Sequence, residues 1–412
     1  MSRGNYLTRA VWQRIIAEKR KVAVNFLSVG GSTMAVPSSP ARIGLLGLGF
    51  GSEFIPIYQQ HPQAEVAAIC QRDPKVLKLC GDRFGIPEAR RFTSYADMLK
   101  APGIDAIHIN TPIPNHAEHS IAALTAGKHV ACTVPMATTV EACAAIVRAQ
   151  RASGKSYMMM ETTCYTREFF YVKELLTSGK LGRVQFLRAA HQQEMAGWPG
   201  YWEGLPPMHY ATHCVGPMLG LVERLARRVS CIGSGRIADT LAIKYGSSFA
   251  VESAHLQLDG SDVGCEMTRS LFETAREYVE SFDVYGSMRS FEWAQLENVS
   301  KPVVFSGEKA EYVDIPDYAS LLPEAIRRFT SVSVYGGAES HLSFKQGNGH
   351  GGSHPHLAHE FISAIVEGRR PAIDDVISAN WTCAGILAHE SALRGGEWID
   401  LPAFTRRVAE AS

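Results

Sequence analysis

Residues 42–52 read RIGLLGLGFGS, and this stretch decides the fold. It opens with a short apolar run, typical of a buried β-strand, and continues with the spacing G-x-G-x-x-S. Glycines at such a turn let the backbone bend tightly and approach a pyrophosphate, whose charge is stabilised by the positive N-terminus of the following helix. The stretch therefore predicts a dinucleotide site that includes Gly47, Gly49, Phe50 and Gly51.

The regular pattern continues along the chain, because short apolar runs alternate with amphipathic stretches up to residue 160. This alternation is typical of βαβ units built around a parallel sheet. Thr139 and Glu141 supply the N-cap and the first-turn acid of one expected helix. The predicted fold class is therefore α/β, with an N-terminal Rossmann domain. We expect strands at 42–46, 66–70, 106–110, 129–132 and 157–160, and helices at 115–126 and 140–151.

The end of the second strand bears on the choice of cofactor. An acid that binds the ribose 2′-hydroxyl usually stands there, about 20 residues after the glycine turn. Here the position is Gln71, followed by Arg72, and the first acid is Asp73. Gln71 can hydrogen bond a ribose hydroxyl, whereas Arg72 can stack on adenine or pair with a 2′-phosphate. We expect NAD as the cofactor, and NADP stays open as the alternative.

The bulk composition excludes several classes of protein. With 412 residues the chain is long enough for two domains, and its 41 basic and 41 acidic residues give no net charge that would draw it to nucleic acid or an anionic membrane. No run reaches the ~18 apolar residues of a membrane span. Residues 1–40 imitate a signal peptide only weakly, so we expect a leader or tail there. The nine scattered cysteines contain no C-x-x-C pair, which predicts buried free thiols in a reducing, cytoplasmic compartment.

Three further segments resemble the Gfo/Idh/MocA oxidoreductase family: NTPIPNH at 110–116, GKHVACTVP at 127–135 and SGKLGRV at 178–184. The resemblance covers nearly everything from residue 41 to the end. It implies a Rossmann domain at 41–161 and an α/β domain at 162–412, whose large, mostly antiparallel sheet holds a small-molecule sugar and often makes homo-oligomer contacts. It also implies further cofactor contacts from Asn110, Thr111, Pro112, His116 and Pro135.

One position departs from the dehydrogenases of that family. Most of them carry Glu-Lys-Pro at the end of the fourth strand, where the lysine helps to move a proton to or from the reacting hydroxyl. This chain has Thr133-Val134-Pro135 instead. Because valine can neither transfer a proton nor hydrogen bond a sugar oxygen, the usual acid–base group is absent.

The segment MHYATHCVGP at 208–217 indicates what replaces that group. It resembles the Tyr-Ala-Thr-His-x-x-Gly-Pro segment of the family's NAD-dependent glycosidases, such as the α-N-acetylgalactosaminidase group, which also have Val-Pro at the fourth strand. Tyr210 and His213 match directly, and the resemblance implies that they are catalytic. Histidine titrates near neutrality, and residues three apart share a helix face. The alternative is a core tyrosine beside a structural histidine. Those glycosidases have an acid where Thr133 stands, so no role is carried over to that residue.

Two other groups of residues are candidates for sugar binding. The glycine-rich loop NGHGGSHPH at 348–356 carries His350 and His354, which can reach a ligand, although such a loop can also simply cap the following helix. Its histidine spacing is not a recognised zinc pattern, and we expect no metal. Trp198 and Trp202 can stack on a sugar ring or serve as ordinary core residues.

These observations predict a sugar-active enzyme, most simply a redox-neutral glycosidase. In this hypothesis NAD+ accepts a hydride from C3 of the sugar, the ketone acidifies the C2 proton, the aglycone is eliminated from C1, and water and the hydride then add back. The alternative is an NAD(P)-dependent sugar or inositol dehydrogenase with His213 as base. A third hypothesis, a non-catalytic dinucleotide-binding regulator, is disfavoured by the presence of Tyr210 and His213.

Overall fold

The computed structural model describes residues 39–196, 203–276, 278–296, 299–331 and 350–405. The expected leader or tail lies outside these ranges except for its last two residues, and so do Trp198 and Trp202. No helix in the described part of the chain is long and apolar enough to cross a membrane.

The first sheet has six parallel strands in the order β3-β2-β1-β4-β5-β6. Each apolar run that the sequence singled out forms one of these strands, which confirms the predicted Rossmann fold. The two-residue β3 is too short to leave a pattern in the sequence. The strands are β1 (Ala41–Leu46), β2 (Ala64–Cys70), β3 (Arg91–Phe92), β4 (Ala106–Ile109), β5 (His129–Thr133) and β6 (Tyr157–Met160).

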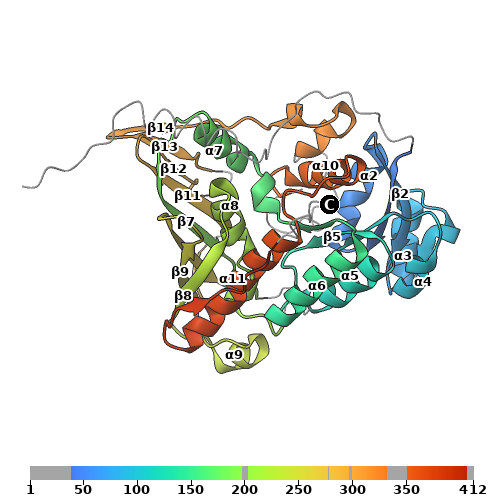
Figure 1. The fold of residues 1–412 in the computed structure, drawn as a ribbon, viewed down its shortest axis with the longest axis horizontal. Coiled ribbons are helices and arrows are strands. Elements are labelled where there is room, and N and C mark those ends of the chain that lie inside the picture. The colour runs from blue at the N-terminus through green and yellow to red at the C-terminus, as the bar shows by residue number, and fades with distance from the viewer. Residues whose placement is uncertain (1–38, 197–202, 277, 297–298, 332–349, 406–412) are drawn as a thin grey trace, which may run out of the picture. The chain divides into compact units, whose positions relative to one another are not determined.

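Helices cover both faces of this sheet (Figure 1). On one face lie α5 (His116–Thr125) and α6 (Val140–Ser153), and Thr139 caps α6 as predicted by accepting a hydrogen bond from the Ala142 N–H. On the other face lies α2 (Ile55–Gln60). Beside it lies α10 (Ser353–Val366), which comes from the C-terminal part of the chain and shares a buried cluster with β1. The core of the dinucleotide-binding unit is thus completed by a helix from beyond residue 161. The outer helices are α3 (Pro74–Arg83) and α4 (Tyr95–Lys100).

The glycine turn leads into a 3₁₀ turn, η1 (Phe50–Phe54), and the α-helix begins only at Ile55. The sequence predicted a helix directly after the turn. Pro56 explains the difference, because proline has no N–H and fits only the first turn of an α-helix. Gly47 has φ +87°, and a Cβ there would lie 2.5 Å from the carbonyl oxygen of Asn110. Only glycine allows this close approach of the two strand ends.

The second sheet has nine strands in the order β14-β13-β12-β11-β7-β10-β9-β8-β15. Only β7 and β10 are parallel neighbours, which confirms the predicted mostly antiparallel sheet. Its strands are β7 (Val184–Gln192), β8 (Ala226–Ser234), β9 (Val251–Leu258), β10 (Gly264–Ser270), β11 (Val279–Gly286), β12 (Ser290–Glu292), β13 (Val303–Ser306), β14 (Lys309–Tyr312) and β15 (Ile399–Asp400).

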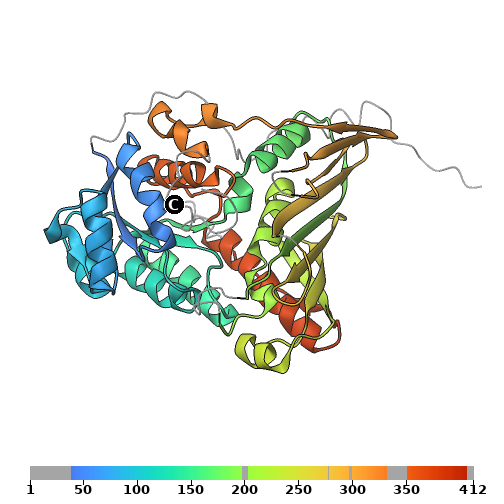
Figure 2. The same ribbon diagram turned by 180° about the vertical axis from the view of Figure 1, so that it is seen from behind.

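Three helices lie on the face of the second sheet that is turned toward the first sheet (Figure 2). They are α7 (Arg167–Thr177), α8 (Thr212–Val222) and α11 (Asp375–Leu393). Because α11 contacts both β8 and α6, one hydrophobic core runs from the second sheet to the first. All nine cysteines are among the described residues, none forms a disulfide, and all are buried except the half-buried Cys80. The remaining elements are η2 (Glu88–Arg90), η3 (Ile113–Asn115), η4 (Thr162–Tyr165), η6 (Pro207–Tyr210), α9 (Asp239–Tyr245), η7 (Ala319–Leu321) and η8 (Glu324–Thr330).

Candidate active site

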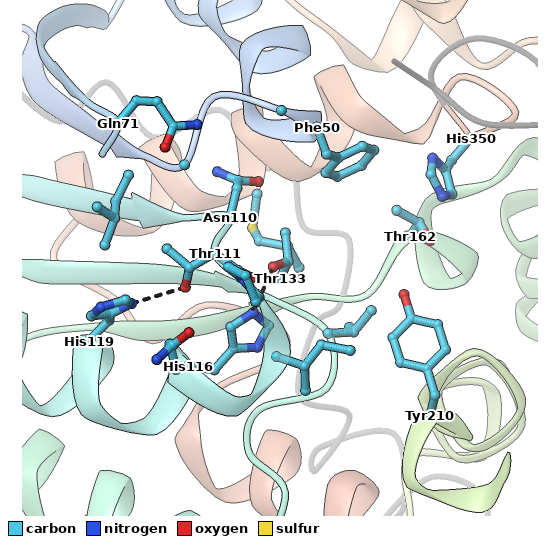
Figure 3. A pocket seen from close by; sticks show the side chains of 18 of the residues that line it. Phe50, Gln71, Asn110, Thr111, His116, His119, Thr133, Thr162, Tyr210 and His350 are labelled. Atoms are coloured by element: carbon cyan, nitrogen blue, oxygen red, sulfur yellow. Dashed lines mark hydrogen bonds between the residues drawn. The ribbon is translucent and has the colours of Figure 1, made fainter. Parts of the chain in front are cut away.

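A cavity of about 530 Å³ lies beyond the carboxyl ends of β1, β2, β4 and β5, with residues of the second sheet on its other side. Ligands of doubly wound sheets bind at this edge. Figure 3 shows side chains that line it. The predicted cofactor residues that line the cavity are Gly47, Gly49, Phe50, Gln71, Arg72, Asn110, Thr111, Pro112 and His116.

The glycine turn and the strand end beside it fit a bound dinucleotide. A Cβ on Gly49 would meet no atom within 4 Å, so this residue faces open space. A Cβ on Gly51 would lie 2.8 Å from Cγ of Asn110, so glycine is needed there for the asparagine to pack on the turn. The Oδ1 atom of Asn110 is buried and has no hydrogen-bond partner among the described residues. A dinucleotide carries hydroxyl and amide donors that would satisfy this acceptor.

The adenosine end of the site is built without a carboxylate. Gln71 accepts a hydrogen bond from the backbone N–H of Arg72 at 2.8 Å, and both residues line the cavity. Asp73, the first acid after β2, instead caps α3 by accepting from the Lys75 N–H at 2.8 Å. Recognition of the ribose is therefore left to the amide and the guanidinium.

His116 ties the ends of β4 and β5 together. Its Nδ1 lies 2.7 Å from the carbonyl oxygen of Pro135, and its Nε2 lies 2.8 Å from that of Thr111. Burial alone would lower the pKa of His116, but Cys132 and the two carbonyls raise it above its ordinary value. Pro135 does not line the cavity itself, so its part in the predicted cofactor site is to hold this histidine. Val134 does line it, as an apolar side chain where the dehydrogenases have lysine.

Tyr210 and His213 come from the junction of η6 and α8 and lie side by side, with ring centroids 5.0 Å apart. Nε2 of His213 lies 3.3 Å from the Tyr210 hydroxyl, and both residues line the cavity. On the other side of the ring, Nδ1 lies 2.6 Å from Oε1 of Glu161, a fully buried carboxylate just after β6. A carboxylate on Nδ1 fixes the tautomer and leaves Nε2 as the proton acceptor toward the cavity.

Three neighbouring strands add a second group of charged side chains to this wall. Glu280 on β11 and Arg269 on β10 are the register partners of His191 on β7, so all three lie side by side. Oε1 of Glu280 lies 3.4 Å from Nε2 of His213 and 3.5 Å from Nε2 of His191, and it accepts a short hydrogen bond from Tyr278. The sheet thus places a second carboxylate against the ring of His213.

These contacts shift the pKa values of the group in opposite directions. Burial alone would lower the pKa of His213, but the carboxylates of Glu161 and Glu280 together raise it above its ordinary value. Burial raises the pKa of Glu280, although His213 and Tyr278 oppose the rise. Burial, Arg269 and His213 lower the pKa of His191 well below its ordinary value. The cluster therefore stabilises the imidazolium of His213 when that ring takes up a proton, beside a neutral His191.

His191, His213 and Glu280 also have the spacing of metal ligands, because one ligand atom from each lies within 4.8 Å of the others. The charges of the site favour a proton over a metal ion. The buried guanidinium of Arg269 offsets part of the negative charge of Glu161 and Glu280, and these two carboxylates already contact the ring of His213. A divalent cation would have to displace those contacts and would add positive charge among buried side chains, which is costly. That no metal is bound stays a prediction.

The structure separates the two loop histidines that the sequence proposed for sugar binding. His350 lines the cavity, and Figure 3 shows it near Phe50 and Thr162 on the same side as Tyr210. His354 is fully buried and does not line the cavity, since it lies behind His350.

Sequence reasoning missed the partners of these residues. Glu161 could have been found, because it directly follows a buried strand of a parallel sheet, where functional groups gather. Glu280, Tyr278 and His191 could not, since their meeting depends on the pairing of β7 with β11.

Comparison with known proteins gives consistent matches. Residues 41–161 match the model of an oxidoreductase family with an NAD-binding Rossmann fold. A glycosyl hydrolase family 109 protein of Solibacter usitatus is 24% identical over 407 residues, which cover 90% of this chain and 89% of that protein. Another, from Shewanella pealeana, is 30% identical over 223 residues, about half of each chain.

Among solved structures, an oxidoreductase from Agrobacterium radiobacter in complex with NAD+, L-tartaric acid and magnesium superposes with a TM-score of 0.70. It is 20% identical, and the match covers 88% of this chain and 98% of that one. This likeness supports the fold. Together the matches confirm the resemblance found in the sequence and a nicotinamide dinucleotide as the cofactor.

Proposed function

We propose that this chain, a Gfo/Idh/MocA-type protein similar to glycosyl hydrolase family 109, is an NAD-dependent glycosidase that cleaves its substrate without net oxidation. The observation that carries the proposal is where the cavity has its proton-transfer group. Val134 stands where the family's dehydrogenases have the lysine that transfers a proton. Glu161, His213 and Tyr210 supply another proton-transfer group on the opposite wall of the cavity.

The bound dinucleotide would take a hydride from a ring carbon of the sugar and later return it to that carbon. The turn at Gly47–Gly51 would hold the phosphates of the dinucleotide. The buried Oδ1 of Asn110, which has no hydrogen-bond partner among the described residues, would accept a hydrogen bond from the cofactor. NAD is favoured over NADP because Gln71 offers an uncharged hydrogen-bonding group, although Arg72 stands beside it. Val134 keeps the floor of the cavity apolar and excludes water there.

The protein's own residues would handle the proton of the reacting hydroxyl. The Tyr210 hydroxyl lies 3.3 Å from Nε2 of His213 and both residues line the cavity, so a proton taken from the sugar can pass through Tyr210 to Nε2 of His213. The Glu161 carboxylate on Nδ1 then stabilises the imidazolium that forms. Glu280 adds a second negative charge 3.4 Å from Nε2, which favours the same state.

The proposal extends to the setting in which the enzyme works. The substrate is a small sugar or glycoside, and we propose a homo-oligomer in the reducing cytoplasm, with no role for nucleic acid or membrane. The absence of disulfides among nine cysteines, all within the described residues, supports the reducing compartment.

The deciding experiment follows turnover in deuterated water. The protein is incubated with NAD+ and a panel of nitrophenyl glycosides and free sugars, while aglycone release and NADH absorbance are recorded. We expect aglycone without net NADH, deuterium at C2 of the released sugar, and retention of a label placed at C3. Stoichiometric NADH from a free sugar, with no aglycone from any glycoside, would establish the sugar dehydrogenase instead.

A further inference from the structure

We propose that His350 is a second acid–base group of the cavity and that a buried Glu53–His354 pair sets its protonation. The inference rests on the proposed function, since redox-neutral cleavage removes two protons from the sugar: one from the reacting hydroxyl and one from the neighbouring carbon. The Tyr210–His213 pair accounts for the first proton. His350 lines the same side of the cavity and is the group we assign to the second (Figure 3).

Three residues lie one after another between the buried interior and the cavity, joined by an ion-pair contact and a hydrogen bond. Oε2 of Glu53 lies 3.2 Å from Nδ1 of His354, and Nε2 of His354 lies 3.2 Å from Nδ1 of His350. Glu53 belongs to η1, directly after the glycine turn, whereas His354 opens α10. The chain therefore links the dinucleotide site to a side chain in the substrate cavity.

The burial of Glu53 requires a compensating partner. Its side chain is 2% exposed, and neither carboxylate oxygen has a hydrogen-bond partner among the described residues. An isolated buried carboxylate is costly, so the imidazole of His354 is expected to carry its proton on Nδ1, toward Glu53. The rings of Phe54 and Phe50 close around His354, at centroid distances of 4.5 Å and 5.2 Å, and exclude water from the pair.

The tautomer of His354 then determines that of His350. With a proton on Nδ1, His354 presents a bare Nε2, which accepts the Nδ1–H of His350. The remaining nitrogen of His350, Nε2, is thus left unprotonated and available to a ligand in the cavity. Burial, followed by His354 and His213, lowers the pKa of His350 well below its ordinary value, so the ring is neutral.

The backbone at this point is unusual for a histidine. His350 has φ +45°, and Gly351 and Gly352 follow with φ +60° and +84°. A Cβ on Gly352 would lie 2.7 Å from the carbonyl oxygen of Thr330, so the turn depends on glycine there. A left-handed non-glycine residue is strained, and such strain is common at functional sites. The turn holds the ring of His350 at the cavity while α10 starts behind it.

Nε2 of His350 takes the proton from the carbon next to the ketone, and the electron pair of that C–H bond forms the double bond. The aglycone oxygen leaves with the electron pair of its C–O bond and takes a proton from a water molecule, which becomes hydroxide. The Nδ1 proton of His350 moves to Nε2 of His354, which becomes an imidazolium beside the Glu53 carboxylate. When that hydroxide adds to the sugar carbon that the aglycone left, the protons move back and His350 reprotonates the neighbouring carbon. Its ring N–H exchanges with the entering water, so solvent deuterium appears at that carbon.

The first test measures tautomers and needs no substrate. Long-range proton–nitrogen spectra of ¹⁵N-histidine protein, assigned through His350→Gln and His354→Gln, should show Nδ1 of both rings protonated. In Glu53→Gln, the uncharged amide should shift the proton of His354 to Nε2 and that of His350 away from Nδ1. An unchanged His350 spectrum in Glu53→Gln would overturn the relay, whether or not the wild-type protein cleaves a glycoside.

The second test measures turnover per folded molecule. His350→Gly removes the ring where glycine fits the backbone without strain, and we expect kcat to fall about 10²–10⁴-fold with partial rescue by added imidazole. His389→Gln is the matched control for His354→Gln, because Nδ1 of His389 pairs with the buried Glu252 at 2.6 Å and neither residue lines the cavity. The relay predicts that only His354→Gln loses kcat. Equal kcat in the two variants, or no rescue of His350→Gly, would overturn it.

Discussion

Glu161→Gln tests the proton-transfer pair most directly. Glutamine keeps the size of glutamate and an oxygen that can accept from the Thr163 N–H and from Nδ1 of His213, but it has no charge. Glu161 is fully buried and His213 is 2% exposed, so solvent does not screen the loss. The variant therefore isolates the charge of Glu161 from its shape.

The size of the effect follows from the contact that is weakened. Glutamine keeps the 2.6 Å hydrogen bond to Nδ1 of His213 but removes the charge that strengthens it. Hydrogen bonds to charged groups contribute about 1.5–3 kcal/mol net and neutral ones about 0.5–1.5 kcal/mol, so about 1–1.5 kcal/mol is lost. Because about 1.4 kcal/mol is a factor of ten in rate, kcat should fall about 5- to 13-fold if the imidazolium of His213 forms in the transition state.

The same pair makes stability depend on pH. Burial alone would lower the pKa of His213, but Glu161 and Glu280 raise it above its ordinary value. A pKa raised by folding contributes stability in full below the unfolded value of about 6.5. This contribution is lost as pH rises through the higher folded value. Relative to Glu161→Gln, the wild-type protein should therefore lose free energy of unfolding as pH rises above about 6.5.

The assay combines kcat for glycoside cleavage with urea unfolding across this pH range. Glu252→Gln is the control, since its carboxylate also lies 2.6 Å from a buried histidine, His389, but away from the cavity. Both variants should lose stability, and only Glu161→Gln should lose kcat. Wild-type kcat in Glu161→Gln, or equal losses in the two variants, would refute the reasoning and make His213 a structural histidine.

Three further perturbations have definite expected outcomes. Gly49→Val should abolish dinucleotide binding in calorimetry without unfolding the protein, because a side chain there enters open space rather than protein atoms; unchanged affinity would contradict the cofactor site. His213→Ala should lower kcat about 10²–10⁴-fold with little change in cofactor affinity, whereas a loss of thermal stability alone would indicate a structural role. Dialysis against a chelator should leave kcat unchanged, and loss of activity restored by a divalent cation would show that His191, His213 and Glu280 bind a metal.

The features that the sequence predicted depend on neighbours along the chain. A buried strand is an apolar run, and the turn at residues 47–51 needs glycine where the backbone must bend or meet Asn110. The helix after the turn was predicted one turn too early because the pattern of apolar residues does not distinguish a 3₁₀ turn from an α-helix. Tyr210 and His213 were found because they lie three residues apart in one motif.

The features that the sequence could not predict depend on long-range register. Along β11, Glu280 shares a face with the buried Phe282 and Val284, so its own strand shows that it points inward but not which side chains it meets. It faces the site because β7 pairs antiparallel with β11 and parallel with β10, which brings Glu280 and Arg269 to the two sides of His191. The pairing of Glu53 could not be predicted for the same reason, since its partner His354 comes from α10, far along the chain.

Charge as well as geometry explains why the proton-transfer group stands at His213, across the cavity, and not at the end of β5. Val134 is 7% exposed within the core shared by the two sheets, at a strand end that His116 already holds through the carbonyl oxygens of Pro135 and Thr111. A lysine there would add a buried cation with no carboxylate nearby, because Glu161 and Glu280 are both engaged by His213 on the other wall. The chemistry points the same way. A dehydrogenase releases a proton with every turnover, whereas a redox-neutral cleavage releases no net proton. Histidines backed by buried carboxylates can take up a proton in the first half of such a reaction and give one back in the second half, after exchange with solvent, and this cavity has that construction at both His213 and His350.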